Sequence, residues 1–150
     1  RRRATDAGRT IEVASPAGLF ALLDRRRVEQ ALGNLVENAL RHGAGTVRLE
    51  AVAAAAELTI EVTDEGEGFP PQFLASAFER FSRADGSRAG AGLGLAIVAT
   101  IAHAHGGAAT AANAPAGGAR VTLTIPAAGS AGREADALSD RRRSPAAGTG

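Results

Sequence analysis

Hydrophobic residues recur along this chain with two different periods, and each period predicts a different kind of element. Between residues 25 and 42 they return every three or four positions, which predicts an amphipathic helix. Asp24 is placed to cap the start of this helix, and Gly43 is placed to end it. A second apolar helix is expected over 93–105, and a short one rich in phenylalanine over 73–81. The apolar face of the first helix consists of Val28, Ala31, Leu32, Leu35, Val36, Ala39 and Leu40.

A period of two predicts the strands. Alternating segments lie at 10–14, 46–52, 57–64, 108–112 and 120–125. In the third segment Leu58, Ile60 and Val62 share one face, and the same parity puts Asp64 on that apolar side. The order of helices and strands predicts an α+β fold, a two-layer α/β sandwich. About three helices are expected to back a mixed, mostly antiparallel sheet of about five strands.

Composition divides the chain into three parts. Residues 1–8 are polar and are expected to be a lead-in or linker, and residues 128–150 are poor in apolar side chains and are expected to be a disordered tail. Residues 9–127 remain as one folded domain, which suits a chain of 150 residues. The sequence does not begin with Met, so we expect it to be part of a longer protein.

Charge and composition exclude several classes of function. There are 17 basic residues, all arginine, against 16 acidic ones, and no cysteine that could supply a disulfide or a thiolate metal ligand. The arginine triplets at 1–3, 25–27 and 141–143 are interleaved with acids and lack aromatic neighbours, so a solvated surface is favoured over a nucleic-acid site. No apolar run approaches the ~20 residues of a membrane span. We therefore expect no nucleic-acid partner and no membrane contact from this segment.

The long predicted helix carries a polar stripe beside its apolar face. Asn34, Asn38 and Arg41 fall within roughly 60° of one another on a helical wheel, and His42 lies between this stripe and the apolar seam. Two carboxamides and a guanidinium suit a hydrated Mg²⁺ and phosphate oxygens. The alternative is an ordinary solvated helix face. Glu37 points away from the stripe and is expected at the surface.

Asp64 begins a second polar cluster. A carboxylate on the buried face of a strand end needs a donor, and either an adenine amino group or the backbone of a turn would supply one. Gly66 and Gly68 allow a sharp turn and the close approach of a ligand. Glu65 and Glu67 are expected to face water, so a paired-carboxylate glycosidase is not favoured.

Two further segments carry candidate phosphate contacts. Gly90, Gly92 and Gly94 lie in the run G-A-G-L-G-L, which exposes backbone N–H groups just before an apolar helix. Such a run is also common in simple turns. Upstream, the run F-E-R-F-S-R carries Arg80 and Arg83, which either reach phosphate or are solvated.

These clusters, in this order, resemble the ATP-binding catalytic domain of sensor histidine kinases. G-N-L-V-E-N-A-L-R-H is similar to the N box of that family, D-E-G-E-G-F to the G1 box, F-E-R-F-S-R to the F box and G-A-G-L-G-L-A-I-V to the G2 box. The resemblance covers about residues 9–126 and extends to the GHKL superfamily of type II topoisomerases, Hsp90 chaperones and mismatch-repair ATPases. It implies the Bergerat ATP-binding fold, ATP and Mg²⁺ as cofactors, and a mobile lid around residues 82–91.

The resemblance also implies residue roles. Asn38 would coordinate Mg²⁺, with Asn34 as a second candidate ligand, and Arg41 would contact phosphates; these three are the candidate catalytic residues. His42 would lie against the nucleotide, and Asp64 would accept a hydrogen bond from the adenine amino group. The remaining candidate nucleotide contacts are Gly66, Gly68, Phe69, Arg80, Arg83, Gly90, Gly92, Leu93, Gly94 and Leu95.

Two departures from the superfamily bear on the reaction. Its ATP hydrolases carry a glutamate at the position of Asn34, and an amide cannot activate water in the same way, so phosphoryl transfer is favoured over hydrolysis. None of His42, His103 and His105 precedes an acidic residue, as the phosphoacceptor histidine of such kinases does. The acceptor is therefore expected on a separate dimerisation domain that the given sequence does not contain.

The resemblance thus implies the catalytic domain of a protein histidine kinase of a two-component system. It would transfer the γ-phosphoryl group of Mg·ATP to a histidine on the dimerisation domain of the same full-length homodimer, for relay to a response regulator. The resemblance places this domain in the cytoplasm, beneath a membrane sensor. The alternatives are a catalytically silent ATP-binding regulatory module, and a serine kinase of the anti-sigma-factor type, which typically carries glutamate at the position of Asn34.

Overall fold

The computed structural model describes residues 2–6, 8–16, 21, 23–54, 56–80 and 93–126. These residues form six strands in one sheet, in the order β1-β2-β3-β4-β6-β5, together with three helices. The elements in chain order are β1 (Arg2–Asp6), β2 (Arg9–Ala14), α1 (Arg25–His42), β3 (Val47–Ala54), β4 (Glu57–Thr63), α2 (Pro71–Leu74), α3 (Gly94–Ala104), β5 (Ala108–Asn113) and β6 (Ala119–Pro126).

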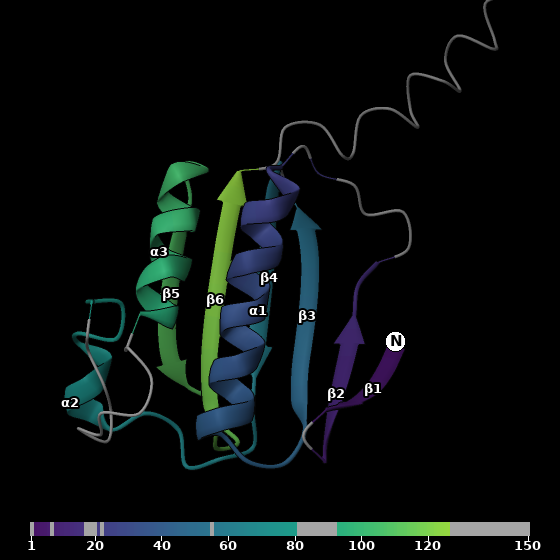
Figure 1. Ribbon diagram of the computed structural model, residues 1–150, viewed down its shortest axis with the longest axis vertical. Coiled ribbons are helices and arrows are strands. Elements are labelled where there is room, and N and C mark those ends of the chain that lie inside the picture. The colour runs from purple at the N-terminus through teal and green to yellow at the C-terminus, as the bar shows by residue number, and fades with distance from the viewer. Residues whose placement is uncertain are drawn as a thin grey trace, which may run out of the picture.

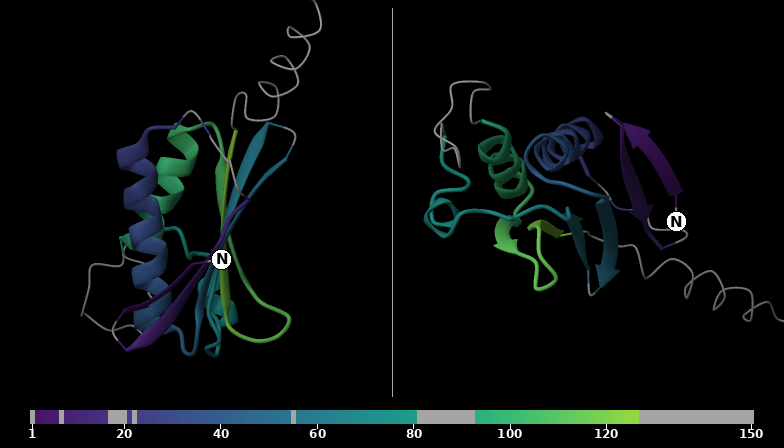
Figure 2. Two further views of the ribbon diagram at one scale, coloured as in Figure 1. Left: turned by 90° about the vertical axis from the view of Figure 1, so that its right-hand side faces the viewer. Right: turned by 90° about the horizontal axis from the view of Figure 1, so that it is seen from below.

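The molecule has two layers. Helices α1 and α3 lie side by side over one face of the sheet, and no described helix covers the other face (Figures 1 and 2). Among the described strands β2 and β3 form the one parallel pair, and the four other pairs are antiparallel. The predicted two-layer sandwich with a mixed, mostly antiparallel sheet is therefore confirmed.

The core lies between the helices and the central strands. Burial alternates along β4, where Leu58, Ile60 and Val62 are buried, as the period of two predicted. Each such side chain stabilises the fold by about 1.5–3 kcal/mol when it leaves water. The largest fully buried side chains are Leu35, Leu123, Ile125, Val47 and Val98. They come from α1, from α3 and from two interior strands, β3 and β6, so one core joins the two layers.

Helix α1 has the predicted bounds and caps. The side chain of Asp24 accepts a hydrogen bond from the backbone N–H of Arg27, with an N···O distance of 3.2 Å. At the other end the N–H of Gly43 donates to the carbonyl of Ala39 at 3.0 Å. Gly43 has φ −88°, which any residue adopts, so the reason for glycine there is not the left-handed backbone that commonly ends helices.

Two elements differ from the sequence-based expectation. Strand β1, within the segment expected to be a lead-in, pairs antiparallel with β2 and adds a sixth strand. Helix α2 is shorter than the predicted 73–81: it covers Pro71–Leu74, and turns follow to residue 80. Proline suits the first position of a helix, where no N–H is needed, so the helix begins at Pro71, two residues before the predicted start.

Some expectations fall outside the described residues. The expected lid at 82–91 and the expected tail at 128–150 both lie there. Within the part of the chain that the structure describes, no helix combines the length and hydropathy of a membrane span.

Candidate functional site

Three of the predicted polar clusters meet at one end of the molecule. The end of α1, the loop after β4 and the start of α3 all lie toward the lower end of Figure 1. A Cβ atom added at Gly94 would lie 3.8 Å from Oδ1 of Asn34, so the start of α3 contacts the middle of α1. A Cβ atom added at Gly43 would lie 2.6 Å from Oδ2 of Asp64, so the end of α1 abuts the loop after β4.

Asp64 is a buried carboxylate that follows β4. It is 6% exposed, on the apolar side of the strand as parity predicted. Its Oδ1 accepts hydrogen bonds from the N–H of Gly66 at 2.7 Å and from the N–H of Ala119 at 3.4 Å. No hydrogen bond from a described residue reaches Oδ2. Both readings of Asp64 therefore stand: one oxygen caps the turn, and the other retains its capacity to accept a hydrogen bond from a ligand.

Glycine is required around Asp64 because backbone closes in on it. A Cβ atom at Gly43 would overlap the carboxyl group of Asp64, and one at Gly118 would overlap its carbonyl oxygen. At Gly66 a Cβ atom would lie 2.9 Å from both the backbone N of Ala44 and Oδ1 of Asp64. The role of Gly43 is therefore to leave room for the carboxylate.

Asn113 holds the loop from the other side, and sequence reasoning missed it. The N–H of Phe69 donates to Oδ1 of Asn113 at 2.6 Å, and Nδ2 of Asn113 donates back to the carbonyl of Phe69 at 3.0 Å. Gly68 adopts φ +82°, which favours glycine, and a Cβ atom there would lie 2.5 Å from Oδ1 of Asn113. The ring of Phe69 is 8% exposed and lies 5.4 Å, centroid to centroid, from the ring of Phe73. The side chain of Phe69 thus belongs to the core, and its backbone is fixed by Asn113.

Glu65 connects the same loop to the segment that follows α1. Its N–H donates to the carbonyl of Ala44 at 2.9 Å, and its Oε2 accepts from the N–H of Thr46 at 2.9 Å. That backbone donor, together with the Arg48 guanidinium at 2.8 Å, lowers the pKa of Glu65. Glu65 is exposed and Glu67 is exposed, as expected for side chains that face water.

The polar stripe of α1 has a different character. Asn34 and Asn38 are half-buried, whereas Arg41 and His42 in the last turn are exposed. Among the described residues none of these four side chains has a hydrogen bond or ion pair. Glu37 is exposed, as predicted. No other described residue therefore engages the polar groups of this stripe.

Of the other predicted nucleotide contacts, some lie within the described residues and some do not. Leu93 is half-buried at the start of α3, and the side chain of Leu95 is 6% exposed and packs in the core. Arg80 is exposed at the end of a described segment. Arg83, Gly90 and Gly92 lie outside the described residues.

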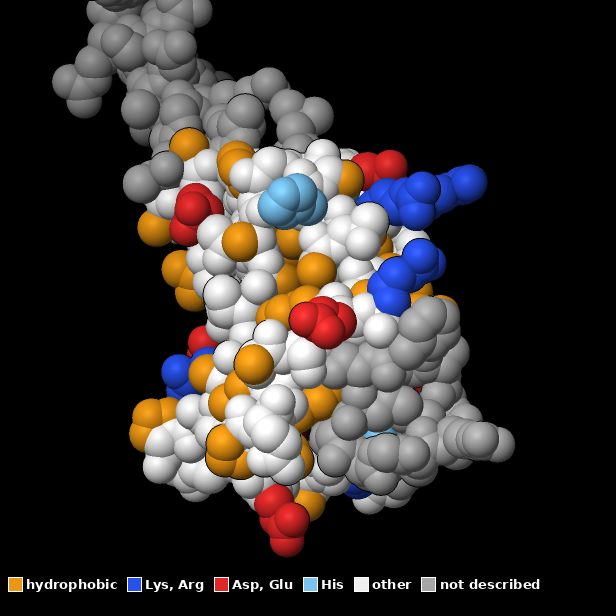
Figure 3. All heavy atoms as spheres, turned by 90° about the vertical axis from the view of Figure 1, so that its left-hand side faces the viewer, with side chains coloured by type: hydrophobic (Ala, Val, Ile, Leu, Met, Phe, Trp, Pro, Cys, Tyr) orange, Lys and Arg blue, Asp and Glu red, His pale blue; other side chains and the backbone are white. Residues whose placement is uncertain are grey.

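The described residues hold no group of three or more His, Cys, Asp or Glu side chains arranged to bind a metal ion. On the face shown in Figure 3 the acidic side chains lie apart from one another. Asn34 and Asn38 lie one turn apart on α1, and Asn34 is beside Gly94. Their amide oxygens are the kind of ligand that Mg²⁺ accepts.

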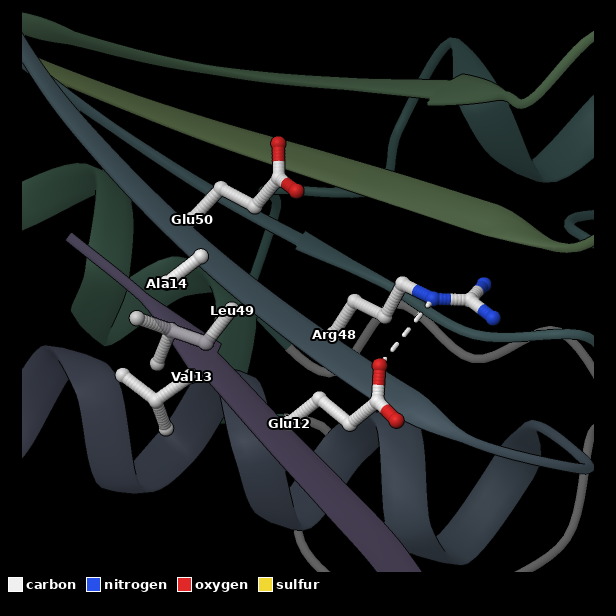
Figure 4. A pocket seen from close by; sticks show the side chains of 6 residues that line it. All are labelled: Glu12, Val13, Ala14, Arg48, Leu49 and Glu50. Atoms are coloured by element: carbon white, nitrogen blue, oxygen red, sulfur yellow. Dashed lines mark ion pairs between the residues drawn. The ribbon is translucent and has the colours of Figure 1, made fainter. Parts of the chain in front are cut away.

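A small depression lies elsewhere, between β2 and β3 (Figure 4). Two of its charged side chains pair with each other, because Arg48 Nε lies 3.7 Å from Glu12 Oε2. Arg48 Nη2 also lies 2.8 Å from Oε1 of Glu65, which is not part of the lining. The one cation of this lining is therefore already paired with carboxylates. Its lining consists of Glu12, Val13, Ala14, Arg48, Leu49 and Glu50.

Comparison with known proteins agrees with this geometry. Residues 23–129, most of the chain, match the family of histidine kinase-, DNA gyrase B- and HSP90-like ATPases. The chain therefore belongs to this family.

Its relatives are sensor histidine kinases. Signal transduction histidine-protein kinase AfsQ2 of Streptomyces coelicolor is 42% identical over 119 residues, which are 77% of this chain and 22% of AfsQ2. Sensor histidine kinase component HK1 of Mycobacterium tuberculosis is 40% identical over 121 residues, which are 79% of this chain and 72% of HK1. The crystal structure of full-length ShkA in complex with AMPPNP has a TM-score of 0.68 and 36% identity, over 81% of this chain and 27% of ShkA. The expected resemblance to the ATP-binding domains of sensor histidine kinases is thus confirmed, and the chain spans about a fifth of the length of AfsQ2.

Proposed function

We propose that this domain binds Mg·ATP where α1, the loop after β4 and the start of α3 meet, and that it delivers the γ-phosphoryl group to a histidine on a separate dimerisation domain. One observation carries the proposal. A buried carboxylate and a stripe of amide and guanidinium groups lie at the same end of the fold, and neither Oδ2 of the acid nor the stripe has a polar partner among the described residues. A base and a chain of phosphates need these two kinds of partner.

The base would be recognised by Asp64. Its Oδ1 is engaged with the N–H of Gly66, which leaves Oδ2 to accept from the adenine amino group. Gly66 and Gly68 would let the ring approach the backbone closely. Because the acid is buried, it strongly favours a ligand that donates a hydrogen bond.

The phosphates would lie along α1 and the start of α3. Asn38 would hold Mg²⁺ through its amide oxygen, with Asn34 as a second ligand, and the ion would neutralise charge on the phosphates. Arg41 would donate to phosphate oxygens and His42 would lie against the nucleotide. The free N–H groups at the start of α3 add a partial positive charge. Arg80, Arg83, Gly90, Gly92, Leu93 and Gly94 complete the proposed contacts, and the core side chains of Phe69 and Leu95 would support the site from beneath.

Transfer is favoured over hydrolysis because of Asn34. An amide is not basic enough to take a proton from water, so this position cannot generate hydroxide. An imidazole is itself nucleophilic, and it needs only a well-positioned phosphoryl group. The proposed partners are therefore a histidine-bearing domain of the same homodimeric protein and, downstream, a response regulator. The proposed location is the cytoplasmic side of a membrane sensor.

The relatives support ATP as the ligand of this domain. AMPPNP, which is bound in the ShkA structure, is an analogue of ATP. The match to a family of ATPases supports the same ligand for this chain.

Binding is tested by calorimetry with Mg·ATP, Mg·GTP and ATP in EDTA. We expect Mg·ATP to bind, Asp64→Asn to weaken it by about tenfold or more, and Asn38→Ala to abolish the gain that Mg²⁺ gives. Glu37→Gln, an exposed change on the same helix, is the matched control. Equal affinity for GTP, or no effect of Asp64→Asn, would contradict the assigned base pocket.

Transfer is tested by mixing the chain with labelled ATP and a dimerisation domain from the same full-length protein. We expect acid-labile, base-stable label on a histidine, and loss of label with Asn38→Ala. ATP binding without transfer would instead indicate the silent regulatory module.

A further inference from the structure

Arg9 is the first residue of β2, yet its side chain bonds to the far end of another element. Its Nη1 donates to the carbonyl oxygens of Ala39 at 2.8 Å, Leu40 at 2.9 Å and Gly43 at 3.1 Å. Its Nε donates to the carbonyl of Gly45 at 2.9 Å. One guanidinium therefore holds the last turn of α1 and two of the three residues that follow it, Gly43 and Gly45.

These carbonyls are the groups that most need an external donor. The last carbonyls of a helix have no partner within the helix, and they carry the negative end of its dipole. A planar cation with several N–H groups in a fixed arrangement can satisfy several of them at once. Gly43 alone supplies only one backbone bond here, to Ala39 at 3.0 Å. Arg9 thus supplies the side-chain hydrogen bonds to this end of α1 among the described residues.

The same turn joins the two halves of the candidate site. It carries Arg41 and directly follows Asn38 on the phosphate side, and Gly43 abuts the carboxylate of Asp64 on the base side. The following residue, Ala44, accepts a hydrogen bond from the N–H of Glu65 at 2.9 Å. A small shift of this turn would change the distance between the polar stripe and Asp64.

We propose that Arg9 is a positioning residue for nucleotide binding: it fixes the last turn of α1 so that Asn38 and Arg41 keep their distance from Asp64. Arg9 touches no part of the proposed nucleotide itself. This inference rests on the proposed function, because it takes the ligand to be Mg·ATP. It places one determinant of affinity on β2, well outside the four sequence boxes.

A plain capping role would make a different prediction. If Arg9 only stabilises the fold, its loss lowers the melting temperature but leaves the affinity of the folded molecules unchanged. If it positions the site, affinity falls at temperatures where every variant is fully folded.

The test uses Arg9→Met, which keeps the length of the side chain and removes its donors, and Arg9→Lys, which keeps the charge. Calorimetry at least ten degrees below the onset of unfolding measures the Kd for Mg·ATP. We expect a Kd about tenfold higher for Arg9→Met and an intermediate value for Arg9→Lys, since an ammonium can reach fewer of the four carbonyls. Amide hydrogen exchange over residues 40–45 should quicken in Arg9→Met.

Two controls separate positioning from general effects. Arg25→Met removes an arginine that pairs with Glu29 at the exposed start of α1, and Ile125→Ala destabilises the core from a fully buried position. Both should retain the wild-type Kd. In a double-mutant cycle, Arg9→Met should raise the Kd less in the Asn38→Ala background than in the wild type. Arg9 acts partly by positioning Asn38, so its effect diminishes once the Asn38 side chain is removed.

The outcomes are distinct. A wild-type Kd in Arg9→Met with a lowered melting temperature would overturn the proposal, and so would an equal loss of affinity in Ile125→Ala. If Arg9→Met does not fold, the Arg9→Lys affinity and exchange data decide in the same way. If the wild-type chain itself does not bind Mg·ATP, the proposed function fails instead.

Discussion

The two halves of the candidate site are built on opposite principles. Around Asp64 the backbone closes in at Gly43, Gly66 and Gly118, and Asn113 fixes the next turn through two hydrogen bonds. Along α1, by contrast, the amide and charged side chains from Asn34 to His42 lack partners among the described residues. The proposed base side is closely packed and hydrogen-bonded, whereas the proposed phosphate side is a row of polar groups without partners among the described residues. Substitutions on the base side should therefore cost stability, and those on the phosphate side should cost affinity.

The largest effect is expected where the backbone is closest. In Gly118→Ala the new Cβ atom would overlap the carbonyl oxygen of Asp64, at a residue with φ +88°. We expect a loss of at least about 3 kcal/mol in the free energy of unfolding, measured with urea. Gly117→Ala is the matched control, because Gly117 has a similar φ of +94° but nothing within 4 Å. It should lose only about 1–2 kcal/mol. Equal losses would mean that backbone strain, not crowding of Asp64, sets the cost.

Asn113→Ala should have the next largest effect. It removes two hydrogen bonds to the backbone of Phe69 and leaves that N–H and carbonyl without their partner. We expect a loss of about 2–3 kcal/mol in stability, and weaker binding of ATP because the loop after Asp64 loosens. Thr110→Ala, an exposed change on the same strand, should stay within about 0.5 kcal/mol of the wild type. Retained stability in Asn113→Ala would show that the loop does not depend on this clamp.

The phosphate side should tolerate an added methyl group. Gly33 lies in α1 directly before Asn34, is exposed, and has nothing within 4 Å of an added Cβ atom. Gly33→Ala should stabilise the protein by about 0.5–1 kcal/mol, because alanine has the higher helix propensity and restricts the unfolded chain. Thermal and urea unfolding measure this gain. A loss of stability would mean that this part of α1 is more constrained than its open surroundings indicate.

The smallest effect concerns acid pH. The N–H of Thr46, followed by Arg48, lowers the pKa of Glu65 in the folded protein. Its contribution to stability is therefore present above the pKa of the unfolded chain and is lost as the pH falls through the lowered folded value. Urea midpoints measured between about pH 3 and pH 6 should vary less in Glu65→Gln than in the wild type. Glu67→Gln, an exposed change in the same loop, is the control. An unchanged slope in Glu65→Gln would contradict this account.

Local sequence patterns predicted the parts of the fold that depend on local rules. The bounds of α1 followed from its period and from Asp24, and the burial of Asp64 followed from strand parity. Strand β1 was missed because its five residues, Arg2–Asp6, carry no alternating apolar signal. Its partner is β2, and charged edge strands of this kind are recognised only through their pairing.

In the candidate site, too, the sequence predicted residues that follow local patterns and missed those that bond to distant segments. The four boxes located the polar stripe and the acid, but they did not indicate Asn113 or Arg9. Asn113 bonds to a residue 44 positions away, and Arg9 bonds to carbonyls at least 30 positions away. Gly43 was expected to end a helix and does so, yet the need for glycine there comes from Asp64. Such tertiary requirements leave no mark in the spacing of nearby residues.

The strand order has a consequence for synthesis on the ribosome. Strand β6 is the last of the described strands to be made, yet it lies between β4 and β5, and its Ile125 pairs with Leu58 of β4. Until residue 126 leaves the exit tunnel, β4 keeps an open edge, β5 lacks its partner strand, and α3 lacks part of the sheet on which it packs. The nascent chain therefore cannot complete the described sheet until β6 has been synthesised. Chaperones can bind the incomplete sheet during the time before β6 emerges.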